Sequence, residues 1–331
     1  LIGSFYFIFV RRVWYPQVII LNESQDGELS SAGLCGNTDV QSVSKQLFKL
    51  LLTLKADFME DDGARVDYKS LFKSFAFRNE YLPLVTQLAN EQLFQLDNNN
   101  QQLVKPFFVN LYNALFLHAR MFDRQTTKSL IDRLLPETIQ NYLIFATYGY
   151  RVGKYVFTLD DIEHGVLRGN AKHPAPASIR GPPFSLDTHR WYSNDAAKFA
   201  LKNPDPRIHF LLNCGAVSCP AVRFLHGSEA QMERQLQNAA EAFCEQEVTI
   251  RITNDNKVHA TLSKIFFWYR NDFGVGDGAN LLLKIAQQFI GRDHPDKEAA
   301  KQYIALFQKS TKPPTQQSKT ETEEIWKVDD L

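Results

Sequence analysis

The sequence is poor in cysteine, balanced in charge and without a long apolar run. Four Cys among 331 residues are too few for a disulfide scaffold, so we expect reduced thiols and a cytoplasmic protein. Lys and Arg number 37, as do Asp and Glu, so no net positive charge favours nucleic acid or an anionic membrane as a partner. The apolar stretch 1–10 ends at Arg11 and Arg12, short of the roughly 18–20 residues that a membrane-spanning helix needs. We therefore expect no nucleic-acid partner and no stable membrane span.

The composition between the two ends is that of a folded protein. Hydrophobic residues make up 44% of the chain and aromatic residues 12%, which is typical of a globular domain and not of a disordered one. We expect residues 1–38 to form a poorly defined leader and residues 39–308 to form one domain. Residues 309–331 are dominated by Lys, Thr, Pro, Gln and Glu, and we expect a disordered tail there. Since the first residue is Leu rather than Met, we expect the chain to be a fragment of a longer one.

Helices dominate the pattern that the apolar residues form. The predicted helices cover residues 43–59, 78–94, 105–122, 133–145, 228–246, 263–273, 279–290 and 297–308. Residues 155–158 and 207–213 predict short strands, and residues 248–253 and 257–262 predict a β-hairpin around a turn at 254–256. Helices around a small, largely antiparallel sheet define an α+β fold.

Two amide side chains lie within the strongly apolar helix predicted at 105–122. Asn110 and Asn113 are three residues apart and therefore share a face. A buried amide without hydrogen-bond partners costs about 1–3 kcal/mol, so each must find a partner. One interpretation is that they hold the backbone of a neighbouring loop. The other is that one of them orients a catalytic imidazole, as an Asn does in papain-like enzymes.

A second group of polar residues falls on a helix predicted to start near residue 159. Asp161, His164 and Arg168 recur at spacings of three and four residues, which places them on one helical stripe. An acid beside a histidine can hold its tautomer and stabilise the imidazolium, so His164 is a candidate general base. The alternative is an ion-pair ladder on the protein surface.

The third group is a pair of thiols, Cys214 and Cys219, that follow the strand predicted at 207–213. A thiol becomes a nucleophile when an imidazolium or backbone N–H groups stabilise the thiolate. Gly215 and Ser218 would let backbone amides turn toward an anion. Two small buried groups and a redox pair are the alternatives. A zinc site needs about four ligands, and the thiols with scattered histidines match no known arrangement, so we predict no metal and no cofactor.

Several stretches of the sequence occur in a characteristic order. They are VDYKSL at 66–71, FFVNLYNALFLHA at 107–119, LDDIEHGVLR at 159–168, DPRIHFLLNCGAVSCPAVR at 205–223 and LSKIFFWYRNDF at 262–273. Together they resemble the family of proteins of unknown function DUF547, over roughly residues 40–275. Members of that family occur alone in bacteria and, in eukaryotes, fused to modules such as DEP, glutaredoxin or leucine-zipper segments. The resemblance therefore implies that this chain is part of a longer multidomain protein.

The resemblance also implies a set of site residues. The polar signature of the family falls on Asn110, Asn113, Glu163, His164, Arg168, Arg207, Cys214, Ser218 and Cys219. This set is similar to the parts of a papain- or transglutaminase-like thiol site in rearranged order, with the histidine before the cysteine.

The sequence therefore predicts a thiol-dependent hydrolase or acyltransferase of unknown substrate. Cys214 would be the nucleophile, His164 the general base, and Glu163 or Asn110 the orienting group. The residues expected to bind at this site are Asn113, Arg168, Arg207, Ser218 and Cys219. The alternative is a non-catalytic module in which the same polar residues shape a surface for a protein or peptide partner.

Overall fold

The computed structural model describes residues 18–23, 40–58, 67–90, 101–125, 137–171, 173–174, 198–213, 223–274, 277–310 and 322–326. The chain divides into two compact units. The first comprises Leu1–Pro204 and Phe224–His226, and the second comprises Asp205–Arg223 and Gly227–Leu331. Most of the predicted leader and tail lies outside the described residues, at 1–17, 24–38, 311–321 and 327–331. The single domain predicted at 39–308 stays a prediction.

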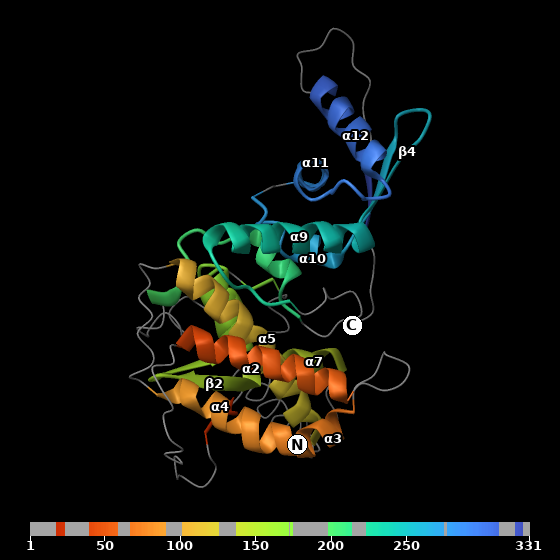
Figure 1. The fold of residues 1–331 in the computed structure, drawn as a ribbon. Coiled ribbons are helices and arrows are strands. Elements are labelled where there is room, and N and C mark those ends of the chain that lie inside the picture. The colour runs from red at the N-terminus through yellow and green to blue at the C-terminus, as the bar shows by residue number, and fades with distance from the viewer. Residues whose placement is uncertain are drawn as a thin grey trace, which may run out of the picture. The chain divides into compact units, whose positions relative to one another are not determined.

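Helix α5 (Gln101–Gln125) forms the core of the first unit, where it packs against α2 (Val40–Asp57) and α3 (Tyr68–Lys73) (Figure 1). Every residue from 106 to 119 is buried. A helix that is apolar on all sides is stable only when it is covered on all sides, and this sequence meets that condition. Pro106 lies in the N-terminal part of the helix, where a proline disturbs few helical hydrogen bonds. The helix predicted at 105–122 is confirmed.

Four other helices in the described part of the first unit are shorter than α5. They are η1 (Phe77–Tyr81), α4 (Leu82–Thr86), η2 (Gln87–Ala89) and α7 (Glu137–Thr147). The single helix predicted at 78–94 is therefore a chain of π-, α- and 3-10-helical segments up to residue 89. Residues 91–94 lie outside the described part of the chain.

A small sheet leads the chain into the polar region predicted near residue 159. Its order is β1 (Ile19–Ile20), β2 (Tyr148–Val152) and β3 (Tyr155–Thr158), with β1 parallel and β3 antiparallel to β2. The strand predicted at 155–158 is confirmed. A tight turn with a positive φ at Gly153 joins β2 to β3, and the chain then enters a helix directly after Thr158.

That helix, η3 (Asp161–Leu167), is a π-helix and all seven of its residues are buried. The backbone N–H of Arg168 donates to the carbonyl of Glu163, and that of Asn170 to the carbonyl of Gly165. The first bond connects residues five apart as in a π-helix, which winds more widely than an α-helix, and the second closes the C-terminal end of the helix, where Gly169 and Asn170 have positive φ. Side chains four and five residues apart, rather than three and four, consequently lie above one another.

The second unit contains α9 (Glu229–Glu247), α10 (Lys264–Trp268), α11 (Gly278–Gln288), α12 (Lys297–Ser310) and a second three-stranded sheet. The predicted hairpin is confirmed as β4 (Thr249–Ile252) and β5 (Val258–Leu262), which pair antiparallel. Strand β6 (Thr322–Trp326) pairs parallel with β5. Five phenylalanine rings pack together in this unit, from Phe210, Phe243, Phe266, Phe273 and Phe289.

The strand predicted at 207–213 is wrong, because this segment begins with the 3-10 helix η6 (Pro206–Phe210). The carboxylate of Asp205 accepts a hydrogen bond from the backbone N–H of Arg207 and caps the helix. Pro206 has no N–H to donate to a sheet and its fixed φ suits the first helical position. These two local effects outweigh the apolar run that follows.

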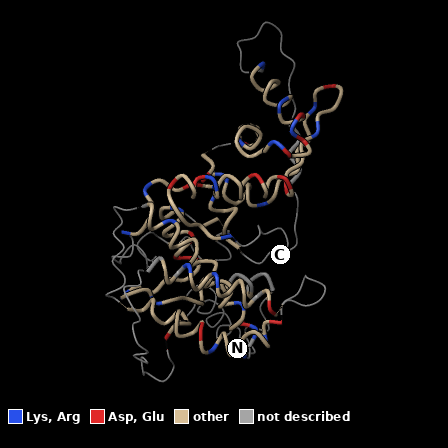
Figure 2. The backbone as a smooth tube through the Cα atoms, viewed as in Figure 1, with Lys and Arg blue, Asp and Glu red and all other residues tan. Residues whose placement is uncertain are grey.

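The described residues thus form a helix-rich α+β fold with two small sheets, where one sheet was predicted. None of the described helices is long and apolar enough to cross a membrane. Acidic and basic residues are interspersed along the described backbone (Figure 2), in line with the zero net charge. That the protein binds no nucleic acid stays a prediction.

A buried hydrogen-bond chain joins α5 to the first sheet. His118 Nδ1 lies 2.8 Å from the hydroxyl oxygen of Tyr150, which lies 2.5 Å from that of Tyr81. All three side chains are fully enclosed, and burial lowers the pKa of His118 to about 3. Burial also raises the pKa of Tyr81 and of Tyr150. His118 is therefore neutral in the folded protein at pH 7.

Replacing His118 with Gln is expected to flatten the acid dependence of stability. The unfolded wild-type chain gains a proton at His118 below a pH of about 6.5, whereas the folded chain does not until about pH 3. The free energy of unfolding therefore falls as pH drops through this window, by up to about 1.4 kcal/mol per pH unit. Urea unfolding at pH 7 and pH 5 should show a smaller fall in His118→Gln than in wild type or in the control His226→Gln. Equal falls in all three would contradict the assignment.

Candidate functional site

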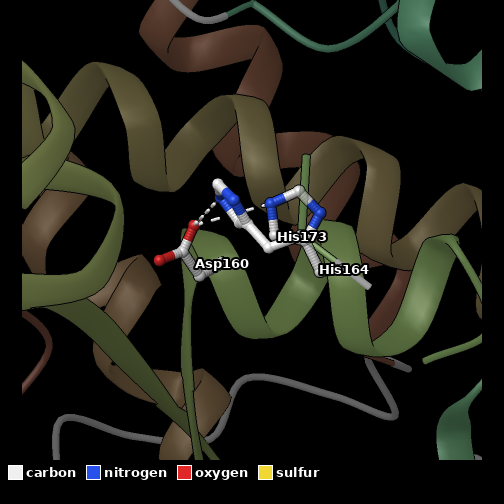
Figure 3. A group of neighbouring side chains, drawn as sticks. All are labelled: Asp160, His164 and His173. Carbon is white, nitrogen blue, oxygen red and sulfur yellow. Dashed lines mark ion pairs between the residues drawn. The ribbon is translucent and has the colours of Figure 1, made fainter. Parts of the chain in front are cut away.

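The first candidate site lies where β3 passes into η3. Asp160 and His164 are buried here, and His173, half-buried, comes from the segment after the helix (Figure 3). Asp160 Oδ1 is 3.7 Å from His164 Nε2 and also 3.7 Å from His173 Nε2. The two imidazole rings meet edge to face, with centroids 4.1 Å apart. We call Asp160, His164 and His173 the histidine cluster.

Charged and polar groups surround His164 on its other side. Arg168 donates from its guanidinium to His164 Nδ1 at 2.8 Å. Because a guanidinium can only donate, Nδ1 accepts, and a neutral His164 carries its proton on Nε2. Glu163 Oε1 lies 3.8 Å from the same Nδ1, and the hydroxyl of Tyr112 on α5 donates to Glu163 Oε2 at 3.2 Å.

The π-helix explains which acid lies beside His164. The sequence predicted one stripe of Asp161, His164 and Arg168, and the pairing of the last two is observed. Asp161 instead accepts hydrogen bonds from the backbone N–H and the hydroxyl of Thr158, at 2.9 and 2.8 Å. In a helix wound more widely than an α-helix, the residue four before His164 takes that place, and it is Asp160.

Sequence reasoning therefore missed Asp160 and His173. Asp160 precedes His164 by four residues, a spacing that places both on one face of a helix, but the stripe predicted from the sequence used Asp161 instead. His173 follows His164 by nine residues in a proline-containing segment, and no periodic pattern indicates that it returns to the helix.

A second histidine–carboxylate pair lies in the other unit. His209 on η6 has its Nε2 2.8 Å from Asp272 Oδ2, and its ring stacks on Tyr269 with centroids 3.7 Å apart. His209 is buried, with a side chain only 2% exposed. Among the described residues, its Nδ1 makes no hydrogen bond. A carboxylate at this distance fixes the tautomer and the orientation of an imidazole.

The predicted site residues in the described part of the chain have different partners. Asn110 accepts from the backbone N–H of Leu225 at 2.9 Å and donates to its carbonyl at 3.0 Å. This contact matches the structural interpretation of Asn110, and its role as an orienting group stays a prediction. Asn113 is buried on the same helix. The guanidinium of Arg207 donates to the carboxylates of Asp205 and Glu233, and the hydrogen bond to Asp205, more than the one to Glu233, raises the pKa of Arg207.

Cys214, Ser218 and Cys219 lie outside the described residues. The pairing of Cys214 with His164 therefore stays a prediction. Cys244 on α9 is described, and burial raises the pKa of its thiol far above the usual value. It is an inert thiol at neutral pH.

A comparison with protein families finds a match that covers the histidine cluster and His209 but not Asp272. Residues 96–244 match the model described as "Protein of unknown function, DUF547". The match is narrower than the resemblance over 40–275, but it includes the histidine cluster, η6 and Cys214. No curated protein and no solved structure matches the chain.

Replacing Asn110 with Ala is expected to lower the free energy of unfolding by about 1–3 kcal/mol. The change removes both hydrogen bonds and leaves the buried N–H and carbonyl of Leu225 without these partners. The matched control is Asn79→Ala, which removes one exposed bond to the carbonyl of Phe75 and should change stability by less than about 0.5 kcal/mol. Equal effects of the two substitutions in urea unfolding would show that the Leu225 contact contributes little.

Proposed function

We propose that the protein is a thiol-dependent hydrolase or acyltransferase with Cys214 as its nucleophile. The observation that carries the proposal is the pair of His209 and Asp272, an imidazole held by a carboxylate in the segment that leads to Cys214. Cys214 follows His209 by five residues, so the Cα atoms of the two residues lie at most roughly 18 Å apart. An oriented imidazole near a thiol is the usual requirement for nucleophilic cysteine chemistry.

The proposed reaction is acyl transfer. His209 takes the proton of the Cys214 thiol, and the thiolate attacks the carbonyl carbon of an ester, thioester or amide. The carbonyl regains its double bond as the leaving group departs with a proton from the imidazolium. Water, or another acceptor nucleophile, then attacks the thioester, gives up a proton to the imidazole and releases the acyl group. Asp272 positions the ring and stabilises its protonated form.

The base predicted from the sequence is His164, and the contacts favour His209 instead. Asp160 Oδ1 and Glu163 Oε1 lie 3.7 and 3.8 Å from ring nitrogens of His164, beyond hydrogen-bond distance, and Arg168 occupies its Nδ1. His209 has its carboxylate at 2.8 Å. With either base, the histidine precedes the cysteine in the chain. We propose that the site is papain- or transglutaminase-like, with its residues in this rearranged order. Reduced thiol chemistry fits the cytoplasmic location predicted above.

Site-resolved alkylation is the direct test of the proposal. With iodoacetamide at pH 6, Cys214 should react at least tenfold faster than free cysteine, because an imidazolium keeps the thiolate populated at a pH where an ordinary thiol is protonated. Cys244 should react slowly and serves as an internal control. His209→Ala and Asp272→Asn should lower the Cys214 rate about tenfold, while His259→Ala, which changes another histidine of the same unit, should not.

The same experiment separates the alternatives. If His164→Ala, and not His209→Ala, slows Cys214, the thiol function stands and the base is the one predicted from the sequence. If Cys214 reacts no faster than free cysteine at pH 6, the thiol function is wrong. A non-catalytic module for a protein or peptide partner would then be the better interpretation, with a folded and fully binding-competent Cys214→Ser variant as its expected result.

A further inference from the structure

We propose that Asp160, His164 and His173 bind one divalent transition-metal ion, with Zn²⁺ as the best match. The histidine cluster lies wholly within the first unit and involves neither Cys214 nor His209. The proposal therefore goes beyond the thiol function and does not depend on it.

The spacing of the ligand atoms is the first argument. Both imidazole nitrogens lie 3.7 Å from the same oxygen of Asp160, which is too long for a hydrogen bond. Two ligands bonded to one tetrahedral zinc ion at about 2.1 Å lie roughly 3.4 Å apart. One such atom from each of the three residues lies within 4.8 Å of the other two. Shifts of a few tenths of an ångström would bring them to coordination distance.

The charge of the site is the second argument. Asp160 and Glu163 are two buried carboxylates, each about 7% exposed, and each has an oxygen within 4 Å of a ring nitrogen of His164, which also accepts from Arg168. An ionised carboxylate is costly to bury unless cations or hydrogen bonds compensate it. A divalent ion between Asp160 and the two imidazoles would add compensating charge at the point where the three side chains converge (Figure 3).

The donor set selects the kind of metal. Two imidazole nitrogens and one carboxylate oxygen suit zinc and its neighbours among the transition metals, whereas Mg²⁺ and Ca²⁺ prefer oxygen ligands. Three protein ligands also leave a coordination position for water or a small ligand, as in catalytic zinc sites and unlike closed structural ones. The site would thus accept a small anionic or carbonyl-bearing ligand on the ion.

Arg168 sets a condition on metal binding. A metal on His164 Nε2 takes the lone pair there, so the ring proton moves to Nδ1 and the hydrogen bond from Arg168 has to break. Glu163 Oε1, 3.8 Å from Nδ1, is the acceptor available for the relocated proton. Carboxylates commonly support metal-bound histidines in this way. Arg168 therefore competes with the metal, and Glu163 supports it.

The test is a Zn²⁺ titration of the full chain after dialysis against a chelator. Calorimetry should give one Zn²⁺ per chain, Co²⁺ should produce the visible absorption of a nitrogen-ligated ion, and Mg²⁺ should give no heat. Asp160→Asn and His173→Ala should weaken Zn²⁺ binding at least tenfold. The matched controls Asp123→Asn and His226→Ala change an acid on α5 and another half-buried histidine of this unit, and they should bind as wild type does.

Two further variants separate a metal site from a merely hydrogen-bonded cluster. Arg168→Gln should tighten Zn²⁺ binding several-fold, and Glu163→Gln should weaken it about tenfold. Absence of Zn²⁺ binding by the wild-type chain, or unchanged affinity in His173→Ala, overturns the proposal. His173 is half-buried, so this variant decides the question even if Asp160→Asn does not fold. The alkylation rate of Cys214 is measured separately, so failure of one proposal leaves the other standing.

Discussion

The winding of η3 determines which polar side chains meet in the first unit. Its backbone hydrogen bonds connect residues five apart, so Asp160, His164 and Arg168 follow one another along a single face. Thr158 and Asp161 close its first turn through their side chains, and Tyr112 holds Glu163 from α5. The π-helix is therefore tied to α5, which is buried from residue 106 to residue 119, and the positions of its charged groups depend on that packing.

The two histidine sites use the same residue types at different distances, and the distance decides the chemistry. His209 and Asp272 are in direct hydrogen-bond contact, which suits an imidazole that must keep one orientation while it exchanges a proton. In the histidine cluster, two rings approach one carboxylate oxygen without reaching it. That separation suits ligand atoms that bind a common metal ion, as proposed above.

The sequence predicted the elements whose signal is local. Helix α5 follows from its apolar residues, and the β4–β5 hairpin follows from alternating residues around a polar turn. The strand predicted at 207–213 failed because a proline and a capping aspartate at its start favour a helix, and those two residues outweigh the apolar run. Histidine 173 could not be predicted as a neighbour of His164, because only the path of the folded chain brings it back. The partner of Asn110, a backbone group 115 residues away, was unpredictable for the same reason.

The short segment Phe224–His226 has a consequence for how this protein can be divided. It belongs to the first unit although the residues on both sides of it belong to the second, so the chain passes between the units at three points. The side chain of Asn110 forms two hydrogen bonds with the backbone of Leu225 within that segment. A division of the chain after residue 204 would separate Asn110 from Leu225, whose backbone groups it hydrogen-bonds. A single cut in the chain therefore cannot yield the two compact units as separate fragments.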